Sequence, residues 1–527
     1  MVFKKPSALR ELTPRLLRIH LFASIGAMNF GYDNNWWSGV INAQSFIDDY
    51  GQNNGPGQPR TLPSSWISIA SGTPIAGWIV GCVIASYLTS TLGRKKTIVI
   101  VCLIALLGMI LQCAIHNYWG LMAGRLVNAL SMGIEANCVP MYMAELAPAS
   151  TRGGLVNLYQ TWLYVGGVLA SATVYASTKH LVGQWTYMTP IVVQLAPPCM
   201  LLCAVWFIPE SPRWLLQKGR MDDARKALAY MRHGVSNEEE VVMELRLVDQ
   251  AMQHEMEIHR ATTYADCFRG SNAHRTLVAM GVQCLQQAQG NSFTSSYLVI
   301  FLNQVGVADP QLITCANLCC CLGGSILAFY LSDKIGRRPM LMGGAFFMAG
   351  LMWTVSGLAS WTPGGVSGAS AQGAIAAILL YGAFAAACWG SVMWTVTAEV
   401  GTSQLRERTM AIATVGGFST SILVTYINPF VQNEPGNLGS RVGMIYGSIS
   451  ILAIVFVFFV VPEMKGRSLE ELDDLFHSKV PAWKSRSFIS TGIGAQITNM
   501  EGANVGEAYD QAVKQALVVD SERVEKV

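Results

Sequence analysis

Long apolar stretches separated by short polar connections run through most of this chain. A stretch of about 20 apolar residues is long enough to cross a bilayer core about 30 Å thick. Twelve such stretches are predicted, at 17–40, 66–90, 97–115, 119–145, 155–177, 187–208, 275–303, 311–332, 339–359, 373–398, 409–430 and 443–461. A chain in lipid must satisfy its own backbone hydrogen bonds, and these stretches lack the alternation of barrel strands, so each is predicted to be a transmembrane helix.

The charged residues at the ends of these stretches occur twice in the same order. The first set is Arg94, Glu145, Arg152 and Glu210, and the second set is Arg337, Glu399, Arg406 and Glu463. In both sets the second arginine follows the first glutamate by seven positions. Such a duplication between membrane-length segments is typical of secondary transporters, whose substrate path lies between two related halves.

This repeat divides the chain into five parts. Residues 1–16 are a polar N-terminal segment, 17–208 the first six-helix bundle, 209–274 a polar linker, 275–461 the second six-helix bundle and 462–527 a polar C-terminal tail. The predicted fold class is therefore an all-α membrane protein of two pseudo-symmetric bundles with additional helices outside the membrane.

The linker has helical patterns of its own. Acidic residues open the segment 221–228, and 237–259 has an amphipathic pattern, so both are predicted to be helices. They either tether the two bundles or brace a gate, and the sequence leaves both alternatives open. The tail beyond residue 467 has low hydrophobicity, so much of it is expected to be disordered or loosely helical.

Composition supports a membrane protein. Only 13% of the 527 residues are charged and 51% are hydrophobic, whereas a soluble domain carries about 25% charged residues. Lysine and arginine concentrate in the connections after the even-numbered stretches, which predicts that both termini lie in the cytoplasm. The net charge of +3 is small and does not indicate a nucleic-acid partner.

The sequence contains no recognisable catalytic or metal-binding pattern. The 13 cysteines lie mostly within predicted helices, and their spacing matches neither a disulfide framework nor a metal site, so they are interpreted as packing residues. A nucleophile–base pair and a phosphate-binding loop are also lacking. We therefore expect a protein that is not an enzyme and that uses no cofactor or metal.

Several motifs in a fixed order resemble the sugar porter family of the major facilitator superfamily, especially its fungal members. They are Gly124-Arg125, Pro140-Met141-Tyr142-Met143-Ala144-Glu145, Arg152-Gly153-Gly154, Pro209-Glu210-Ser211-Pro212-Arg213-Trp214-Leu215, Gln286-Gln287, Asp333 with Gly336-Arg337-Arg338, and Pro462-Glu463-Met464-Lys465-Gly466-Arg467. The resemblance covers residues 17–475. It implies the major facilitator fold of twelve transmembrane helices and the uptake of a sugar by alternating access.

The duplicated charges are interpreted as a cytoplasmic gate. A positive-inside signal needs no carboxylates, yet acids recur here in register with the arginines. Arginine–carboxylate pairs would hold the halves together in one state and separate in the other, and the resemblance implies the same role. The first repeat differs from the second, because Ser90 stands where the second has Asp333. The lock of the first half is therefore either weaker or completed by another residue. The alternative is ordinary topology-setting charge.

Asp33, within the first stretch, is the candidate for proton coupling. A carboxylate at membrane depth costs several kcal/mol unless it is paired, protonated or hydrated, which marks it as a functional candidate. Arg125, at the start of the fourth stretch, is its predicted partner. In proton-coupled members of the family that the chain resembles, an aspartate here pairs with that arginine. Proton symport, facilitated diffusion and a purely structural ion pair remain as alternatives.

A sugar site needs amides, hydroxyls and an aromatic face. The resemblance implies that substrate is bound by Gln160, Gln283, Gln286, Gln287, Asn291, Ser292 and Trp394. Gln283, Gln286 and Gln287 share one helical face through their i, i+3, i+4 spacing. For each of these residues the alternative is hydrogen bonding or packing between helices.

Two departures from the hexose pattern restrain the choice of substrate. The ligand asparagine is replaced by Ser292, or its role has moved to Asn291, and Gly417-Phe418 replaces an Asn-Trp pair. The predicted function is proton-coupled uptake of a hexose or related monosaccharide. A disaccharide, a polyol, a sugar acid or quinate, and a facilitator mechanism, remain alternatives, as does a non-transporting sugar sensor. The expected partners are the sugar, a proton and the lipid bilayer of the plasma membrane.

Overall fold

The computed structural model describes residues 13–490, with gaps at 42, 53–59, 149–150, 233–237, 259–262, 292–293, 295–309, 361–367, 433–435, 437, 479 and 489. Throughout the described residues the regular structure is helical. One isolated antiparallel bridge, between Gln52 and Thr61, is the exception.

Helices occupy the six predicted spans of the first half. They are α2 (Pro14–Ser24) with α3 (Gly26–Val40), α5 (Ser64–Leu92), α6 (Arg94–Ala114), α7 (Tyr118–Leu146), α8 (Arg152–His180), and α9 (Trp185–Val193) with α10 (Ala196–Ala204) and η1 (Val205–Phe207). The short helix α4 (Gln44–Tyr50) follows the first span. The sixth span is divided where Pro197 and Pro198 open α10, because proline has no backbone N–H to continue the helical ladder.

The second half repeats this order. Its helices are α14 (Gly270–Gln286) with η3 (Gln287–Asn291), α16 (Pro310–Ile335), α17 (Arg337–Ser360), α18 (Gly368–Phe384) with η4 (Ala385–Gly390) and α19 (Ser391–Val400), α20 (Arg406–Gln432), η5 (Gly439–Arg441) and α21 (Val442–Val460). Most of the predicted span 275–303 beyond Asn291 lies outside the described residues. Both η3 and η4 are π-helical turns, a local geometry that is frequent at functional sites.

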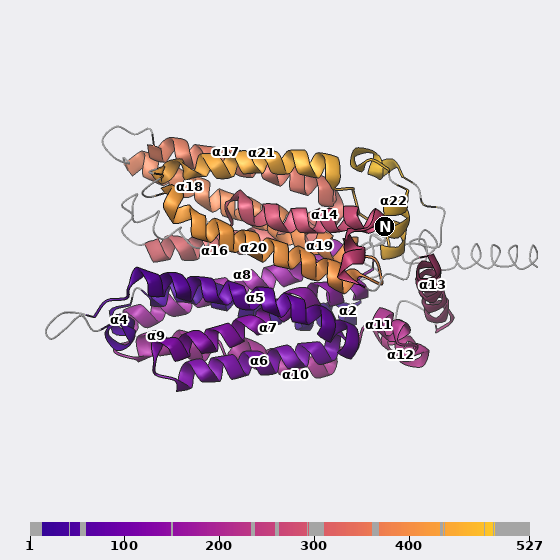
Figure 1. Cartoon of the computed structure of the whole chain (residues 1–527), viewed down its shortest axis with the longest axis horizontal. Helices are drawn as coiled ribbons and strands as arrows, with labels where there is room; N and C mark the ends of the chain where they lie inside the picture. The colour runs from indigo at the N-terminus through magenta and orange to yellow at the C-terminus, as the bar shows by residue number, and fades with distance from the viewer. Residues whose placement is uncertain are drawn as a thin grey trace, which may run out of the picture.

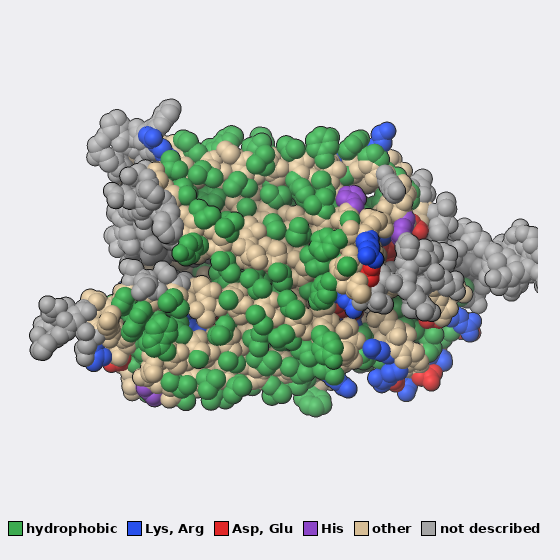
Figure 2. All heavy atoms as spheres, in the orientation of Figure 1, with side chains coloured by type: hydrophobic (Ala, Val, Ile, Leu, Met, Phe, Trp, Pro, Cys, Tyr) green, Lys and Arg blue, Asp and Glu red, His purple; other side chains and the backbone are tan. Residues whose placement is uncertain are grey.

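The two halves lie side by side with their helices roughly parallel (Figure 1). Helix α16 packs along α8, and α20 packs along α5, so these pairs form the interface between the halves. Hydrophobic side chains cover much of the face shown in Figure 2, and charged side chains gather toward its ends. An apolar lateral surface between charged ends is what a bilayer requires.

Eight helices among the described residues are long and apolar enough to cross a membrane. The remaining four predicted spans contain Asp33, Arg125, Gln160 and Gln283, which are polar residues of the candidate site. The protein is therefore a multi-pass, all-α membrane protein, as predicted.

Two glycines allow α3 and α8 to touch. A Cβ at Gly31 would lie 1.8 Å from the carbonyl oxygen of Leu163, and a Cβ at Gly166 would lie 2.1 Å from that of Met28. Only glycine permits such an approach of two backbones, and small residues are the usual means of close packing between membrane helices.

The linker and tail helices gather at one end of the bundles (Figure 1). We call it the arginine end, because Arg94 contacts Glu210 of the linker and Arg337 contacts Glu463 of the tail there. These helices are α11 (Pro212–Gln217), α12 (Met221–Met231), α13 (Glu238–Ile258), η2 (Tyr264–Phe268), α22 (Leu469–His477) and η6 (Ala482–Ser487). The predicted linker helices correspond to α12 and α13. The described part of the tail is more ordered than expected, because α22 buries Leu472 and Phe476 beneath the second half. Residues 491–527 lie outside the described residues.

Candidate substrate path and gate

The lock of the first half is centred on Arg94, which is 1% exposed at the start of α6. Its Nη2 donates to Oε1 of Glu145 at 2.7 Å and its Nε donates to Oε2 at 3.1 Å. Ser211 also donates to this carboxylate at 2.5 Å. The carboxylate of Glu145 is thus held by a two-point guanidinium contact, the strong form of a charge-assisted hydrogen bond.

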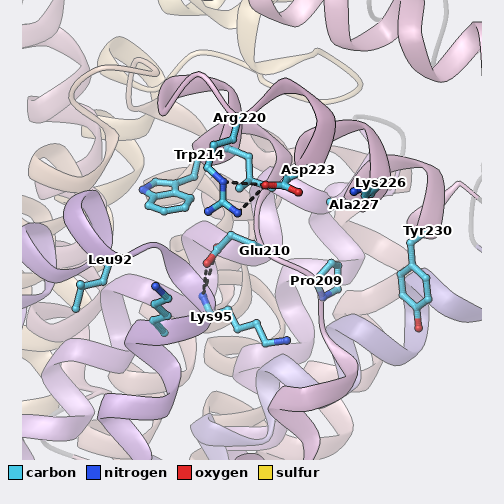
Figure 3. A pocket seen from close by; sticks show the side chains of 12 residues that line it. Leu92, Lys95, Pro209, Glu210, Trp214, Arg220, Asp223, Lys226, Ala227 and Tyr230 are labelled. Atoms are coloured by element: carbon cyan, nitrogen blue, oxygen red, sulfur yellow. Dashed lines mark hydrogen bonds and ion pairs between the residues drawn. The ribbon is translucent and has the colours of Figure 1, made fainter.

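Glu210 covers the N-terminus of the same helix. It accepts the backbone N–H groups of Arg94 at 2.9 Å and Lys95 at 3.2 Å, where a helix dipole favours negative charge. Figure 3 shows Glu210 above Lys95, in a surface pocket that is also lined by Asp223 of α12 and by Arg220, which directly precedes α12. Burial raises the pKa of Glu210, against the opposing effect of these backbone donors.

The second half repeats this arrangement. Arg337 donates to Glu399 at 2.8 Å through Nη2, and its backbone N–H donates to Glu463 at 3.0 Å. Asp333, one turn before Arg337, adds a further contact at 3.2 Å to the guanidinium. Glu145 of the fourth predicted span and Glu399 of the tenth therefore each pair with an arginine of their own bundle.

Contacts between the bundles come from other atoms of these clusters. Asp333 accepts the backbone N–H groups of Gly153 at 3.0 Å and Gly154 at 2.8 Å, which open helix α8 of the first half. Arg406 of the second half lies 3.6 Å from Glu145 of the first. Arg152 donates to the backbone carbonyl of Arg467 at 3.1 Å.

Glu407 supplies the acid that the first repeat lacks. It lies in the first turn of α20 in the second half, and its Oε1 accepts Nη2 of Arg94 at 2.9 Å. Ser90, which occupies the place of Asp333, donates instead to the carbonyl of Tyr87 in its own helix. The lock of the first half is completed across the interface. The sequence did not single out Glu407, although its neighbour Arg406 was a candidate. The position that matches Glu407 in the first repeat is Gly153, so the repeat gave no signal for an acid there.

Helix α22 adds a second connection that the sequence did not indicate. Glu470 pairs with Arg213 of α11, and Asp473 pairs with Arg275 of α14 at 2.5 Å. The linker that follows the first half and the first helix of the second half are therefore joined through the tail. Burial alone would raise the pKa of Glu470, but the guanidinium of Arg213 outweighs it and holds that pKa below its usual value.

Asp33 and Arg125 lie together inside the first bundle, 1% and 3% exposed. Nη2 of Arg125 is 3.9 Å from Oδ2 of Asp33, and its guanidinium lies over the ring of Trp37 at 4.3 Å. Oδ1 of Asp33 accepts hydrogen bonds from Gln194 at 2.8 Å and from Asn128 at 3.2 Å. The ion pair is loose, while the carboxylate is well supplied with neutral donors.

Three of the predicted sugar ligands gather around α19. Trp394 donates through Nε1 to Oε1 of Gln160 at 2.8 Å, which joins the second half to the first. Gln283 of α14 donates to Thr397, one turn further along α19, at 3.2 Å. All three predicted residues are buried.

The other predicted ligands follow Gln283 along the same segment. Gln286 is 7% exposed, and its Oε1 has no hydrogen-bond partner among the described residues. Gln287 and Asn291 belong to the π-helical turn η3 and are half-buried. Ser292 lies outside the described residues.

Gly417 and Phe418 stand where the hexose pattern has an Asn-Trp pair. A Cβ at Gly417 would lie 3.1 Å from the side chain of Gln283, so glycine makes room for that amide. Phe418 packs against Trp78 and Phe30 of the first half, with ring centroids 5.3 and 6.2 Å away. Its ring closes the interface between the bundles.

Two bundles joined at paired arginine locks, with buried amides and an ion pair between and within them, define a secondary transporter of the major facilitator type. The chain belongs to the sugar (and other) transporter family, whose model matches residues 19–476.

Individual relatives support this assignment. The chain is 31% identical to a probable glucose transporter of Neurospora crassa over 93% of its length and 84% of the relative. It is 30% identical to the high glucose sensor of Saccharomyces cerevisiae. The matched region covers 90% of this chain but only 62% of the sensor. It is similar in fold to the proton:xylose symporter XylE bound to 6-bromo-6-deoxy-D-glucose. That similarity has a TM-score of 0.74 at 22% identity and covers 88% of this chain and 99% of the other.

Proposed function

We propose that this sugar transporter family member is a proton-coupled symporter that takes up a hexose or related monosaccharide by alternating access. The observation that carries the proposal is the buried pair of Asp33 and Arg125, 3.9 Å apart. A buried carboxylate beside a cation can be poised between its two protonation states, and binding of one ligand can then be linked to binding of the other. The symporter named among the structural relatives and the glucose transporter among the sequence relatives agree with this function.

The arginine end is proposed to face the cytoplasm of the cell, with the protein in the plasma membrane. With Arg94, Arg337 and their acids closed, the substrate path would then be open only toward the outside. Separation of the contacts that join the two bundles, Arg94 with Glu407 and Asp333 with the start of α8, would release sugar inward. The linker helices α12 and α13 pack beneath this end, which favours the bracing role over a simple tether.

The amides between the bundles are proposed to bind the sugar. Gln160 and Trp394 offer a hydrogen-bonding edge and an aromatic face, and the unpartnered Oε1 of Gln286 would accept a sugar hydroxyl. Competition of glucose, fructose, xylose, galacturonate, quinate, maltose and lactose against one labelled sugar would assign the substrate among the monosaccharide, disaccharide, sugar acid and quinate alternatives.

The coupling is tested by Asp33→Asn in a yeast strain that lacks its own sugar transporters. We expect the variant to lose accumulation of sugar against a gradient and to retain sugar exchange across the membrane. Asp223→Asn is the matched control, because Asp223 is 42% exposed at its side chain and lies in the linker. Accumulation by Asp33→Asn equal to that of the parent would refute proton coupling through this pair, and a facilitator would remain.

A sugar sensor is the second candidate, since one relative of 30% identity is a high glucose sensor. Uptake of radiolabelled sugar separates the two, because a sensor would bind sugar without net flux.

A further inference from the structure

Glu135 is a buried acid that belongs neither to the gate nor to the Asp33 pair. It lies in the middle of α7, is 2% exposed, and its Oε1 has no hydrogen-bond partner among the described residues. Arg125 precedes it by ten residues and Glu145 follows it by ten. At 1.5 Å per residue it is roughly 15 Å along the helix from either site.

No cation balances this carboxyl group within the described part of the chain. It packs against α3, where a Cβ at Gly26 would lie 2.6 Å from Oε1, and no ion pair joins it to a lysine, arginine or histidine there. The titratable groups that face it are the thiols of Cys102 on α6 and Cys138 on α7 and the phenol of Tyr159 on α8. All three are neutral at pH 7.

The imidazole of His20, further along the bundle, already has hydrogen-bond partners. His20 hydrogen-bonds to the carbonyl of Met143, more than two turns further along α7. A lone carboxylate in this position would cost several kcal/mol, whereas a protonated carboxyl group is tolerated. The surroundings of Glu135 therefore favour its neutral, proton-carrying form.

A row of buried amides leads from Asp33 toward Glu135. Gln194 donates to Asp33 at 2.8 Å and to Asn29 at 3.4 Å, and Asn29 donates to Asn128 at 3.4 Å. Asn128 precedes Glu135 by seven residues, and Asn29 follows Gly26 by three. Spacings of three and seven keep residues on one helix face, so the row and Glu135 share the same side of α3 and α7.

Unpaired polar atoms beside this row indicate internal water. Gln112 of α6 is fully buried, and neither its Oε1 nor its Nε2 has a hydrogen-bond partner among the described residues. Its Cγ would lie 2.7 Å from a Cβ at Gly124, which places it against α7 near Asn128. Oε1 of Gln194 is likewise unpartnered among the described residues. Buried amides are rarely left unsatisfied, and ordered water is their usual partner in such positions.

We propose that Glu135 is a second proton-binding site, which exchanges a proton with Asp33 through water inside the first bundle. In the transfer, the O–H bond of protonated Asp33 breaks, the proton passes along the water, and an O–H bond forms on the Glu135 carboxylate. Asp33 is left as a carboxylate beside Arg125. Oδ1 of Asp33 accepts three N–H groups, from Trp36, Asn128 and Gln194, and donors of this kind stabilise the carboxylate that the transfer leaves. The role in transport rests on the proposed proton coupling, but the presence of the proton on Glu135 does not.

Infrared spectroscopy of the purified protein in lipid vesicles tests the site directly. We expect a carboxylic-acid C=O band at neutral pH that shifts in D₂O, is lost in Glu135→Gln and is retained in Asp33→Asn. A spectrum unchanged by Glu135→Gln would overturn the proposal, whatever the transport assays show.

Transport assays test the role of the site. We expect Glu135→Gln, which mimics the protonated acid, to lose accumulation and to retain sugar exchange, and Glu135→Asp to restore part of the accumulation. Exchange by the Gln variant also shows that it is folded. Full accumulation by Glu135→Gln would overturn the role. If Asp33→Asn alone accumulates sugar normally, the proposed coupling fails, while the infrared band still reports on Glu135.

Discussion

The contact between Arg94 and Glu407 makes a prediction about the closed state of the gate. Glu407→Gln keeps a neutral acceptor of the same shape and removes a charged one that lies 2.9 Å from Arg94 across the interface. A hydrogen bond to a charged group contributes about 1.5–3 kcal/mol. Because this contact exists only while the bundles are closed at the arginine end, its loss shifts the equilibrium toward the open state by about 10- to 150-fold.

Hydrogen–deuterium exchange of the protein in nanodiscs measures this shift, since amide exchange reports the free energy of opening. We expect faster exchange in peptides that cover 89–97 and 403–409. The matched control is Glu238→Gln, which weakens an exposed pair with Arg225. Ser90→Asp combined with Glu407→Gln should restore part of the protection, because an acid at this position is expected to cap α20 across the interface, as Asp333 caps α8. Unchanged exchange in Glu407→Gln would refute the reasoning.

Three further predictions concern folding and stability. Gly31→Ala should destabilise the protein by about 1–3 kcal/mol or more through overpacking, measured by thermal unfolding, whereas Gly72→Ala, which meets no atom within 4 Å, should not. Trp394→Phe leaves the buried Oε1 of Gln160 without its donor, so it should lower stability by about 1–3 kcal/mol in the same assay. The pKa of Glu470 is lowered in the folded state, so its pair is stabilising above the unfolded pKa of about 4.3 and is lost as pH falls below it. Glu470→Gln should therefore make stability less dependent on pH in that acid range.

The transmembrane helices were predictable because their signal is local. A run of apolar residues of sufficient length specifies a helix in lipid whatever lies beside it. The described helices accordingly occupy all twelve predicted stretches, although the end of the seventh lies outside them. The repeats also predicted that arginines and carboxylates would pair at these helix ends. They did not indicate that Arg94 with Glu145, and Arg337 with Glu399, would pair within a single bundle rather than between the halves.

The partners across the interface were not predictable in this way. Glu407 follows Arg406 and resembles a surface charge in the sequence, and its proximity to Arg94 depends on how α20 packs beside α5 and α7. Helix α22 has an ordinary amphipathic pattern, and its order depends on arginines from two other segments. Glu135 lies within the fourth predicted stretch, so the argument that marks Asp33 applies to it as well. That it has no cationic partner among the described residues is visible only in the structure.

The asymmetry of the two locks bears on how the gate is controlled. In the second half, Asp333 contacts Arg337 of the same bundle and also caps α8 of the first half. One acid from the second half therefore contacts both bundles. In the first half, the acid comes from α20, so Arg94 loses a charged partner when the bundles separate. Opening therefore leaves Arg94 with Glu145 alone, whereas Arg337 retains both Glu399 and Asp333. Of the two lock arginines, only Arg94 loses a charged partner on opening, so a change at Glu407 should affect the conformational equilibrium more than the same change at Glu399, which pairs within its own bundle in either state.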